Sequence, residues 1–389
     1  MHLDPLLPPL VGTLVVILAI GLMLRTFRQP QLVGYILAGF AIGPHGLGWI
    51  TDVVTAEHLG AIGVTLLLFF IGMEVSPRQI VRGWRIAVVG TLLQILVSLG
   101  LVWMVGYWLD WSMARIVLLG FVISLSSTVV VLKLLQDHGE LGSSAGQNVV
   151  LILLTQDLAV VPMLIVVSML GGEFPSNYDL VKQVFGAVLV LGLAAFILSR
   201  EQVHLPLPEY VRQDHELQVF AAMFACFGMA FLTGMLGLSS ALGAFIGGML
   251  IASARETDWV HHALEPLRVV FVALLFVSVG MLIDAAFVLQ NWLLILSLVT
   301  AVLLSNTFIN AGILRVLGNS WPTSLYSGAL LAQIGEFSFV LASVGLQAGI
   351  ITGFGHQLTV AVIAFSLVLS PPWIGGIKRL PAIWSRMQA

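Results

Sequence analysis

The stretch LLTQDLAVVP, residues 153–162, places an amide and a carboxylate in the middle of a long apolar run. The run predicts a helix over 146–170, long enough to cross a hydrocarbon core about 30 Å thick. Asp157 would then lie inside a membrane, where an acid is costly and usually serves a function. The alternative is an acid whose interhelical hydrogen bonds serve only the structure.

The composition indicates the same class of protein. The chain has 389 residues, of which 59% are hydrophobic and 9% charged, whereas soluble domains carry roughly 25% charged residues. The net charge of −3 gives no indication of nucleic acid binding, and the single cysteine, Cys226, excludes an intramolecular disulfide. The N-terminus lacks the basic region of a cleaved signal peptide, so we expect the first segment to remain as a membrane helix. We therefore predict an all-α polytopic membrane protein.

Apolar segments of this kind recur along the whole chain. Thirteen spans are predicted, at about 7–24, 31–48, 58–75, 86–109, 113–133, 146–170, 180–199, 215–235, 237–253, 266–284, 290–313, 323–348 and 356–377. With the N-terminus outside, 14 of the 16 Lys and Arg residues fall on the inner side, and only Arg115 and Lys182 fall outside. This is the positive-inside pattern. It predicts a multi-pass protein of the inner or plasma membrane with a cytoplasmic C-terminus, and a single transmembrane domain over 1–389.

The two halves of the chain resemble each other. Four alignments occur in order at offsets of 208 or 209 residues: GYILAGFAIG (34–43) with GAFIGGMLIA (243–252), LLLFFIGM (66–73) with LLFVSVGM (274–281), SSTVVVL (126–132) with GEFSFVL (335–341), and QDLAVVP (156–162) with FSLVLSP (365–371). They predict five-helix repeats over about 30–170 and 239–377. The copies begin on opposite sides, so they are inverted, a construction typical of secondary transporters. The alternative is a generic Gly and Leu similarity among membrane helices.

The repeat makes the acid more informative. Asp157 aligns with Ser366 and Gln156 with Phe365. The predicted scaffold therefore occurs twice, but the acid occurs once. A group present in one copy alone is explained more easily by function than by architecture.

Two further spans carry small and polar residues at matching depths. Ser126, Ser127 and Thr128 lie in the fifth span, and Gly335 and Glu336 lie in the twelfth. Such residues let a helix unwind and turn its free carbonyls and helix ends towards an ion. Ordinary small-residue helix packing is the alternative for each span taken singly. Glu336 could bind the ion or bond a neighbouring backbone.

Asn306 and Asn310 are one turn apart and share a face of the eleventh span. They are candidates for lining the same cavity, and tying helices together is the equal alternative. The sequence has no Gly-rich phosphate loop, no HExxH and no GxSxG. Enzyme activity is therefore not predicted, and neither is a cofactor or a metal beyond a transported cation.

Nearly the whole chain resembles the monovalent cation:proton antiporter-2 family, most closely the Kef-type potassium efflux systems. The motifs that carry the resemblance are GYILAGFAIGPHGL (34–47), IGVTLLLFFIGMEVSP (62–77), SLSSTVVVLKLL (124–135), LLTQDLAVVP (153–162), LGAFIGGMLIAS (242–253), EPLRVVFVALLFVSVGMLID (265–284) and AQIGEFSFVL (332–341). The resemblance implies a sodium/proton-antiporter-like fold, in which crossed unwound helices match the fifth and twelfth spans. It also implies a homodimer whose core domain moves in an elevator fashion.

By the same resemblance, Asp157 carries the cation and the proton, with Gln156 beside it. Sodium-specific relatives often have paired acids there, so Gln156 favours potassium. The chain departs from many relatives in having no Lys in the eleventh span, where Asn306 is the nearest equivalent, which puts a salt-bridge switch and the charge stoichiometry in doubt. Kef-type proteins also carry a cytosolic nucleotide-binding regulatory domain, linked to glutathione control. No stretch of residues 1–389 is predicted to form such a domain, so a regulatory domain, if one exists, would lie beyond Ala389 or on another chain.

The sequence therefore predicts a K⁺/H⁺ antiporter. A Na⁺/H⁺ antiporter is the nearest alternative. A channel-like cation pathway and a membrane sensor that binds ions without transporting them are alternatives of other classes.

Overall fold

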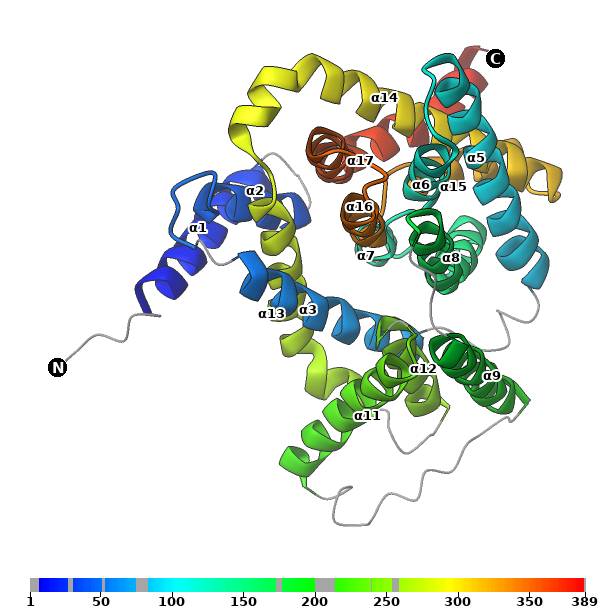
Figure 1. The fold of residues 1–389 in the computed structure, drawn as a ribbon. Coiled ribbons are helices and arrows are strands. Elements are labelled where there is room, and N and C mark those ends of the chain that lie inside the picture. Colours follow the sequence, from blue (N-terminus) through cyan, green and yellow to red (C-terminus); the bar gives the residue numbers. More distant parts are fainter. Residues whose placement is uncertain are drawn as a thin grey trace. The chain divides into compact units, whose positions relative to one another are not determined.

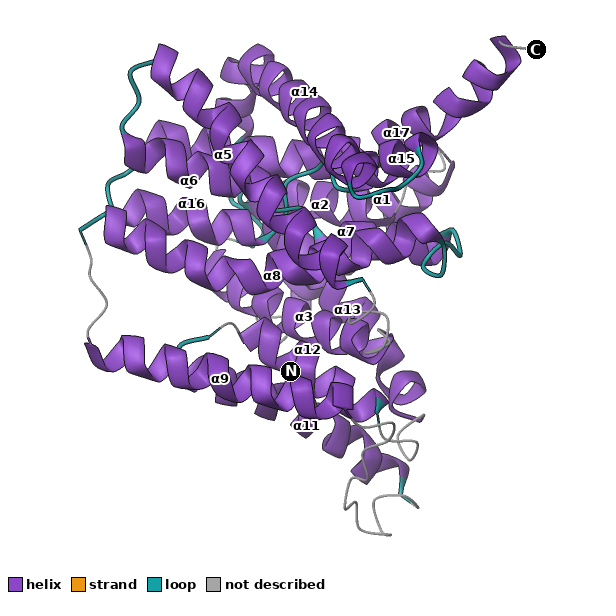
Figure 2. Ribbon diagram, turned by 90° about the vertical axis from the view of Figure 1, so that its right-hand side faces the viewer, coloured by secondary structure: helices purple, strands orange, loops and turns teal. Residues whose placement is uncertain are grey.

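The structure is a computed structural model that describes residues 7–26, 31–50, 53–74, 83–172, 177–199, 214–238, 240–253 and 259–387. Every regular element in these ranges is a helix, and none of them contains a strand (Figure 2). Each predicted span coincides with one helix or with two helices in succession. Six basic residues predicted on the inner side lie outside the described ranges, namely Arg28, Arg78, Arg82, Arg200, Arg212 and Arg255.

Five helical segments among the described residues are long and apolar enough to cross a membrane, and a bent helix would add a sixth. Further apolar helices are shorter than this test requires, among them Val33–Ile42 and Leu242–Ala252. The all-α membrane architecture is thus confirmed for at least five spans.

The chain divides into two compact units. The first comprises Met1–Val53, Gly83–Phe174 and Val279–Ala389. Its helices are α1 (Leu7–Thr26), α2 (Gln31–Ile42), the π-helix η1 (Arg85–Gly90), α5 (Thr91–Trp108), α6 (Met113–Ser124), α7 (Thr128–Asp137), α8 (Ser144–Leu170), α14 (Ala285–Val316), α15 (Trp321–Leu330), α16 (Phe337–Gln347) and α17 (Gly353–Met387). Within it, α16 packs against α6 and α8, and α14 packs against α5, α15 and α17 (Figures 1 and 2).

Two helices of this unit are interrupted where the sequence predicted it. The first interruption, 125–127, separates α6 from α7, and the second, 331–336, separates α15 from α16. The two interruptions bond each other directly: the Gly335 N–H donates to the Leu125 carbonyl at 2.8 Å, and the Ser126 hydroxyl donates to the Leu331 carbonyl at 2.8 Å. Because backbone groups inside a bilayer need internal partners, each break supplies partners for the other.

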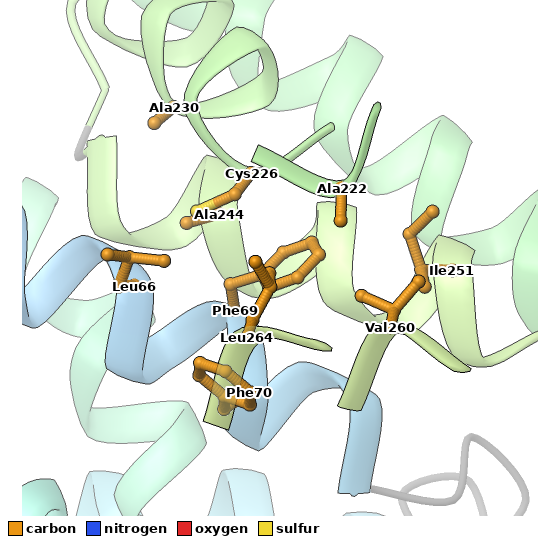
Figure 3. Packing of buried hydrophobic residues seen from close by; sticks show 10 residues of the cluster. All are labelled: Leu66, Phe69, Phe70, Ala222, Cys226, Ala230, Ala244, Ile251, Val260 and Leu264. Atoms are coloured by element: carbon orange, nitrogen blue, oxygen red, sulfur yellow. The ribbon is translucent and has the colours of Figure 1, made fainter. Parts of the chain in front are cut away.

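The second unit comprises Val54–Arg82 and Pro175–Ser278. Its helices are α3 (Val53–Glu74), α9 (Asn177–Ser199), α11 (His215–Met235), α12 (Ser240–Ala252) and α13 (Trp259–Met281), the last of which belongs to it up to Ser278. Figure 3 shows its buried cluster, in which Phe69 and Phe70 of α3 lie among small side chains of α11 and α12, such as Cys226 and Ala244. The two rings meet edge to face, with centroids 6.3 Å apart. Small partners let the helices approach closely, which is how membrane helices gain contact area.

Two helix crossings depend on glycine. A Cβ atom on Gly72 of α3 would lie 2.0 Å from the Phe245 carbonyl oxygen of α12. A Cβ on Gly280 of α13 would lie 2.0 Å from the Ile36 carbonyl oxygen of α2. In the repeat alignment Gly72 corresponds to Gly280, and Ile36 corresponds to Phe245.

Gly72→Ala should therefore destabilise the second unit, because the added methyl group meets backbone and not a flexible side chain. We expect a loss of about 1–3 kcal/mol, as for other overpacked contacts, measured by thermal unfolding of the detergent-solubilised protein. Gly192→Ala in α9, where nothing lies within 4 Å of the new methyl group, should not destabilise the protein and should raise its stability by up to about 1 kcal/mol, because Ala favours a helix more than Gly does. Equal effects of the two changes would contradict the close crossing.

Three polar side chains tie the α7–α8 connection to the second half of the first unit. Glu140 accepts hydrogen bonds from Lys378 of α17 and from the hydroxyl of Tyr326 of α15. The Lys378 ammonium also lies 5.1 Å from the centroid of the Tyr326 ring. Burial raises the pKa of Glu140, but the bonds from Lys378 and Tyr326 outweigh it, so the pKa of this carboxyl lies below its ordinary value.

A lowered pKa in the folded state means that the Glu140 carboxylate stabilises the fold above its unfolded-state pKa, and that this contribution disappears as the pH falls through the lowered value. Glu140→Gln should therefore be less stable than the wild type at neutral pH, by no more than about 1 kcal/mol because the pair is partly solvated. The difference should shrink on acidification below about pH 4.5. Thermal unfolding of both proteins between pH 7 and pH 3 measures it, and a difference that grows towards low pH would contradict the assignment.

Candidate functional site

The site residues predicted from the sequence belong to the first unit and gather around the two interruptions. Helix α8 runs beside them and carries Gln156 and Asp157. It is bent by 42° between its Ser144–Asp157 and Pro162–Leu170 parts. A proline inside a helix removes one backbone donor and clashes with the carbonyl four residues earlier. Pro162 therefore places the bend directly after the acid.

The Asp157 carboxylate faces the start of α7. Its two oxygens lie 3.3 and 3.2 Å from the Thr128 hydroxyl, which donates to them. Thr128 is the first residue of α7, and the N-terminus of a helix carries a partial positive charge of about half a unit. Within the described part of the chain, no Lys, Arg or His pairs with Asp157, which is itself partly exposed. The acid is thus held by a hydroxyl and a helix end, and not by a salt bridge.

Gln156 has a different environment, because its amide braces the first interruption. Its oxygen accepts from the Ser126 N–H at 2.9 Å. Its nitrogen donates to the Ser124 carbonyl at 3.1 Å and to the side-chain oxygen of Gln94 at 2.7 Å. Gln156 is 1% exposed. One side chain therefore satisfies a free carbonyl and a free N–H of the unwound backbone.

The second interruption is braced in a similar way. The Ile334 N–H donates to the hydroxyl of Ser366 at 3.1 Å. Ser366 is the residue that aligns with Asp157 in the repeat. Each interruption thus has one backbone N–H bonded by a side chain of the helix that comes after the interrupted pair, α8 for the first interruption and α17 for the second.

Glu336 brings a second carboxyl group to the same place. It precedes α16 and lies beside Ser127 and the N–H of Val129, in the first turn of α7. One of its oxygens is buried without a hydrogen-bond partner, and Glu336 interacts electrostatically with Asp157. Two carboxyl groups, one from each predicted repeat, therefore share the positive end of α7.

Asn306 of α14 links the two interrupted helices. Its amide nitrogen donates to the Ile123 carbonyl at 2.8 Å and to the Ala332 carbonyl at 3.1 Å. Its amide oxygen is buried and has no partner. Asn310, one turn further on, donates only to the Asn306 carbonyl, at 2.9 Å within α14. Of the two alternatives predicted for these residues, Asn306 ties helices together, whereas Asn310 bonds only within its own helix.

The profile of the family described as "Sodium/hydrogen exchanger, transmembrane" matches residues 12–377. The chain belongs to this family. It is therefore a multi-pass membrane antiporter of the cation/proton class, and the resemblance to Kef-type proteins is confirmed by similar proteins named as K⁺ efflux antiporters.

Three relatives illustrate the range of the family. The iron transporter MagA of Paramagnetospirillum magneticum is 36% identical over 92% of this chain and 83% of its own length. The putative cation/proton antiporter YbaL of Escherichia coli is 30% identical over 95% of this chain and 68% of its own length. The K⁺ efflux antiporter 6 of Arabidopsis thaliana is 34% identical over 93% of this chain, which spans 61% of that protein.

The sodium proton antiporter MjNhaP1 of Methanocaldococcus jannaschii has a similar solved structure. The TM-score is 0.66 over 97% of this chain and 99% of that one, at 17% sequence identity. This similarity shows the antiporter fold and nothing about the cation.

Sequence reasoning missed Gln94, which is 1% exposed and bonds Gln156. A signal was present, because Thr91, Gln94 and Ser98 recur at helical spacing in an otherwise apolar span. It also missed that the Asn306 amide reaches both interruptions, because those carbonyls lie far from it in the sequence.

Asn306→Leu should remove both links while keeping a side chain of similar size. We expect a loss of about 1–3 kcal/mol, because two buried carbonyls lose their donor, measured by thermal unfolding in detergent. Asn310→Leu is the matched control, since it removes a single bond within one helix. A control that is as destabilised as Asn306→Leu would show that the links between the interruptions contribute little.

Proposed function

We propose that this family member exchanges K⁺ for H⁺, and that Asp157 carries the cation and the proton in turn. The observation that carries the proposal is the Asp157 carboxylate, partly exposed beside an interrupted helix and bonded by a hydroxyl instead of a basic side chain. A carboxylate that is mostly shielded from water needs a compensating positive charge. With no basic side chain paired to it in the described structure, a proton or a metal cation can supply that charge.

Competition for the same oxygens turns this site into an exchanger. A bound proton excludes the cation, and a bound cation excludes the proton. If the site opens to one side of the membrane at a time, each passage of a cation is coupled to a proton moving the other way. The exchange needs no covalent chemistry and no cofactor.

The surrounding groups suit a weakly hydrated monovalent cation. The unwound segments offer hydroxyls from Ser126, Ser127 and Thr128, together with backbone carbonyls, and Gly335 lets the second segment come close, since a Cβ there would lie 2.4 Å from the Ser126 carbonyl oxygen. Oxygen atoms of this kind can replace the water around K⁺. Direct contact between the cation and Gln156 or Glu336 stays a prediction, as does a cavity lined by Asn306 and Asn310.

Potassium is favoured over sodium by the neutral Gln156 beside the acid and by the relatives named as K⁺ efflux antiporters. Sodium is the second candidate, because Glu336 brings a second carboxyl group to the site. One relative is named an iron transporter, so iron belongs among the cations tested.

The architecture we propose around the site has thirteen spans, ten of which form two inverted five-helix repeats, with the N-terminus outside. One pair of matching contacts supports the repeats, namely the glycine crossings at Gly72 and Gly280. A similar bracing of one backbone N–H, at Ser126 and at Ile334, occurs in both copies, one residue out of the alignment. The division of the chain into two compact units supports an elevator mechanism, since the carrier residues all belong to one unit. A homodimer and a nucleotide-binding regulatory partner are proposed from the family resemblance.

Purified protein in proteoliposomes, loaded with a pH-sensitive dye, tests the function. Addition of K⁺ should dissipate an imposed pH gradient at lower concentration than Na⁺ does, and Asp157→Asn should reduce exchange to the level of empty vesicles. Asp110→Asn is the control, because Asp110 is an exposed residue between α5 and α6 whose positive φ of 51° suits Asn as well.

Four results would overturn parts of the proposal. Exchange by Asp157→Asn at the wild-type rate would remove Asp157 from the site. If exchange were saturated at a lower concentration of Na⁺ or Fe²⁺ than of K⁺, that ion and not K⁺ would be the exchanged cation. Cation flux that leaves the pH gradient unchanged would indicate a channel-like pathway, and binding without flux would indicate a sensor.

A further inference from the structure

Helix α5 is polar on the side that it buries. Thr91, Gln94 and Ser98 are each at most 1% exposed, whereas Leu96 and Trp103 on other faces of the helix are 62% and 51% exposed. In a membrane protein, apolar side chains face lipid, and a buried amide is costly unless it is bonded. The buried polar side chains of α5 are therefore expected to have hydrogen-bond partners in the neighbouring helices.

Gln94 makes one such contact, and it is with Gln156. The Gln94 side-chain oxygen accepts from the Gln156 amide nitrogen at 2.7 Å. The second hydrogen of that nitrogen serves the Ser124 carbonyl, and the Gln156 oxygen serves the Ser126 N–H. A reversed Gln156 amide would point its oxygen at two acceptors and its NH₂ group at an N–H donor. Gln94 and the unwound backbone thus hold the amide in one orientation.

Gln94 does not satisfy its own hydrogen-bonding groups by this arrangement. Its amide nitrogen is buried without a partner, which costs stability. An apolar residue at this position would remove that cost, and what it would lose is the acceptor for Gln156.

The second interruption shows why an external acceptor is needed at the first. There the brace is Ser366, whose hydroxyl is oriented by donating to the Ile363 carbonyl of its own helix at 2.7 Å. Gln156 is longer, with three rotatable bonds, and its side-chain hydrogen bonds are all to other segments of the chain. Holding a flexible side chain in one rotamer costs entropy. The contact from α5 offsets that cost.

We propose that Gln94 is a positioning residue for the ion site at Asp157, acting through the Gln156 amide. The inference rests on the function proposed for Asp157. Gln156 and Asp157 are neighbours on α8, and Thr128, which donates to Asp157, lies two residues after Ser126, whose N–H Gln156 bonds. The position of the Thr128 hydroxyl relative to the Asp157 carboxylate therefore depends on the backbone segment that Gln156 bonds. Gln94 in turn orients the Gln156 amide. Gln94 does this without touching the ion.

The test is a double-mutant cycle with Gln94→Leu and Gln156→Leu, read as the half-saturating concentration of the exchanged cation in proteoliposomes. Gln94→Leu alone should raise this concentration about three- to tenfold, the equivalent of one lost hydrogen bond. In the Gln156→Leu background, Gln94→Leu should change the half-saturating concentration by less than about twofold, because the amide through which Gln94 acts is already absent. A role of Gln94 in general stability would give the same effect in both backgrounds.

Ser98→Ala is the matched control. Ser98 lies one turn further along the buried side of α5, is fully buried, and has a hydroxyl without a partner, so its removal should leave the cation dependence unchanged. Thermal unfolding checks that each variant is folded, and Gln94→Met replaces Gln94→Leu if the latter is not. A folded Gln94 variant with the wild-type cation dependence, or an undiminished effect in the Gln156→Leu background, would overturn the proposal.

A failure of the proposed function would look different. Wild-type protein that exchanges no cation refutes the antiporter, whatever Gln94 does. The double-mutant cycle then uses cation binding, measured as the K⁺ or Na⁺ concentration that gives half of the maximal rise in unfolding temperature. The expected fold-changes for Gln94→Leu in the two backgrounds are the same as for exchange. Absence of any cation effect on the unfolding temperature would overturn both proposals.

Discussion

The constraint on which this structure depends is that a helix interrupted inside a membrane must find new partners for its free backbone groups. At both interruptions those partners are the other interruption and a few buried polar side chains. Leu125 and Gly335 bond through their backbones, and Ser126 bonds the Leu331 carbonyl. Asn306 adds one donor to each side. These bonds hold irregular backbone in a fixed shape at membrane depth, beside the proposed ion site.

The same constraint explains why the two halves differ where they do. Each interruption needs one side chain to bond a free N–H. The second uses Ser366, at the position that aligns with the acid. The first uses Gln156, the preceding residue, and this leaves Asp157 outside the brace. In the second copy the polar residue at this position, Ser366, bonds the backbone. In the first copy Asp157 makes no such bond, and it is the proposed carrier of the cation and the proton.

Much of this could be predicted from the sequence, and the physical reasons are identifiable. Helix positions follow from apolar length, the interruptions from clusters such as Ser126–Thr128, and the acid from the cost of Asp157 in an apolar run. The partners could not be predicted. Gln94 and Asn306 are polar residues in apolar helices, and their significance depends on carbonyls and amides that are 26 to 183 residues away.

The sequence by itself determined that the chain is a membrane protein of many helices, that two helices break, and that acids, Asp157 and Glu336, lie within apolar spans. These features follow from local composition and spacing, which act on each helix separately. Only the tertiary structure decided that Gln156 braces the backbone, that Asp157 is held by Thr128, and that Asn306 joins the two breaks. Hydrogen bonds depend on distance and direction between atoms, and the packing of helices sets both.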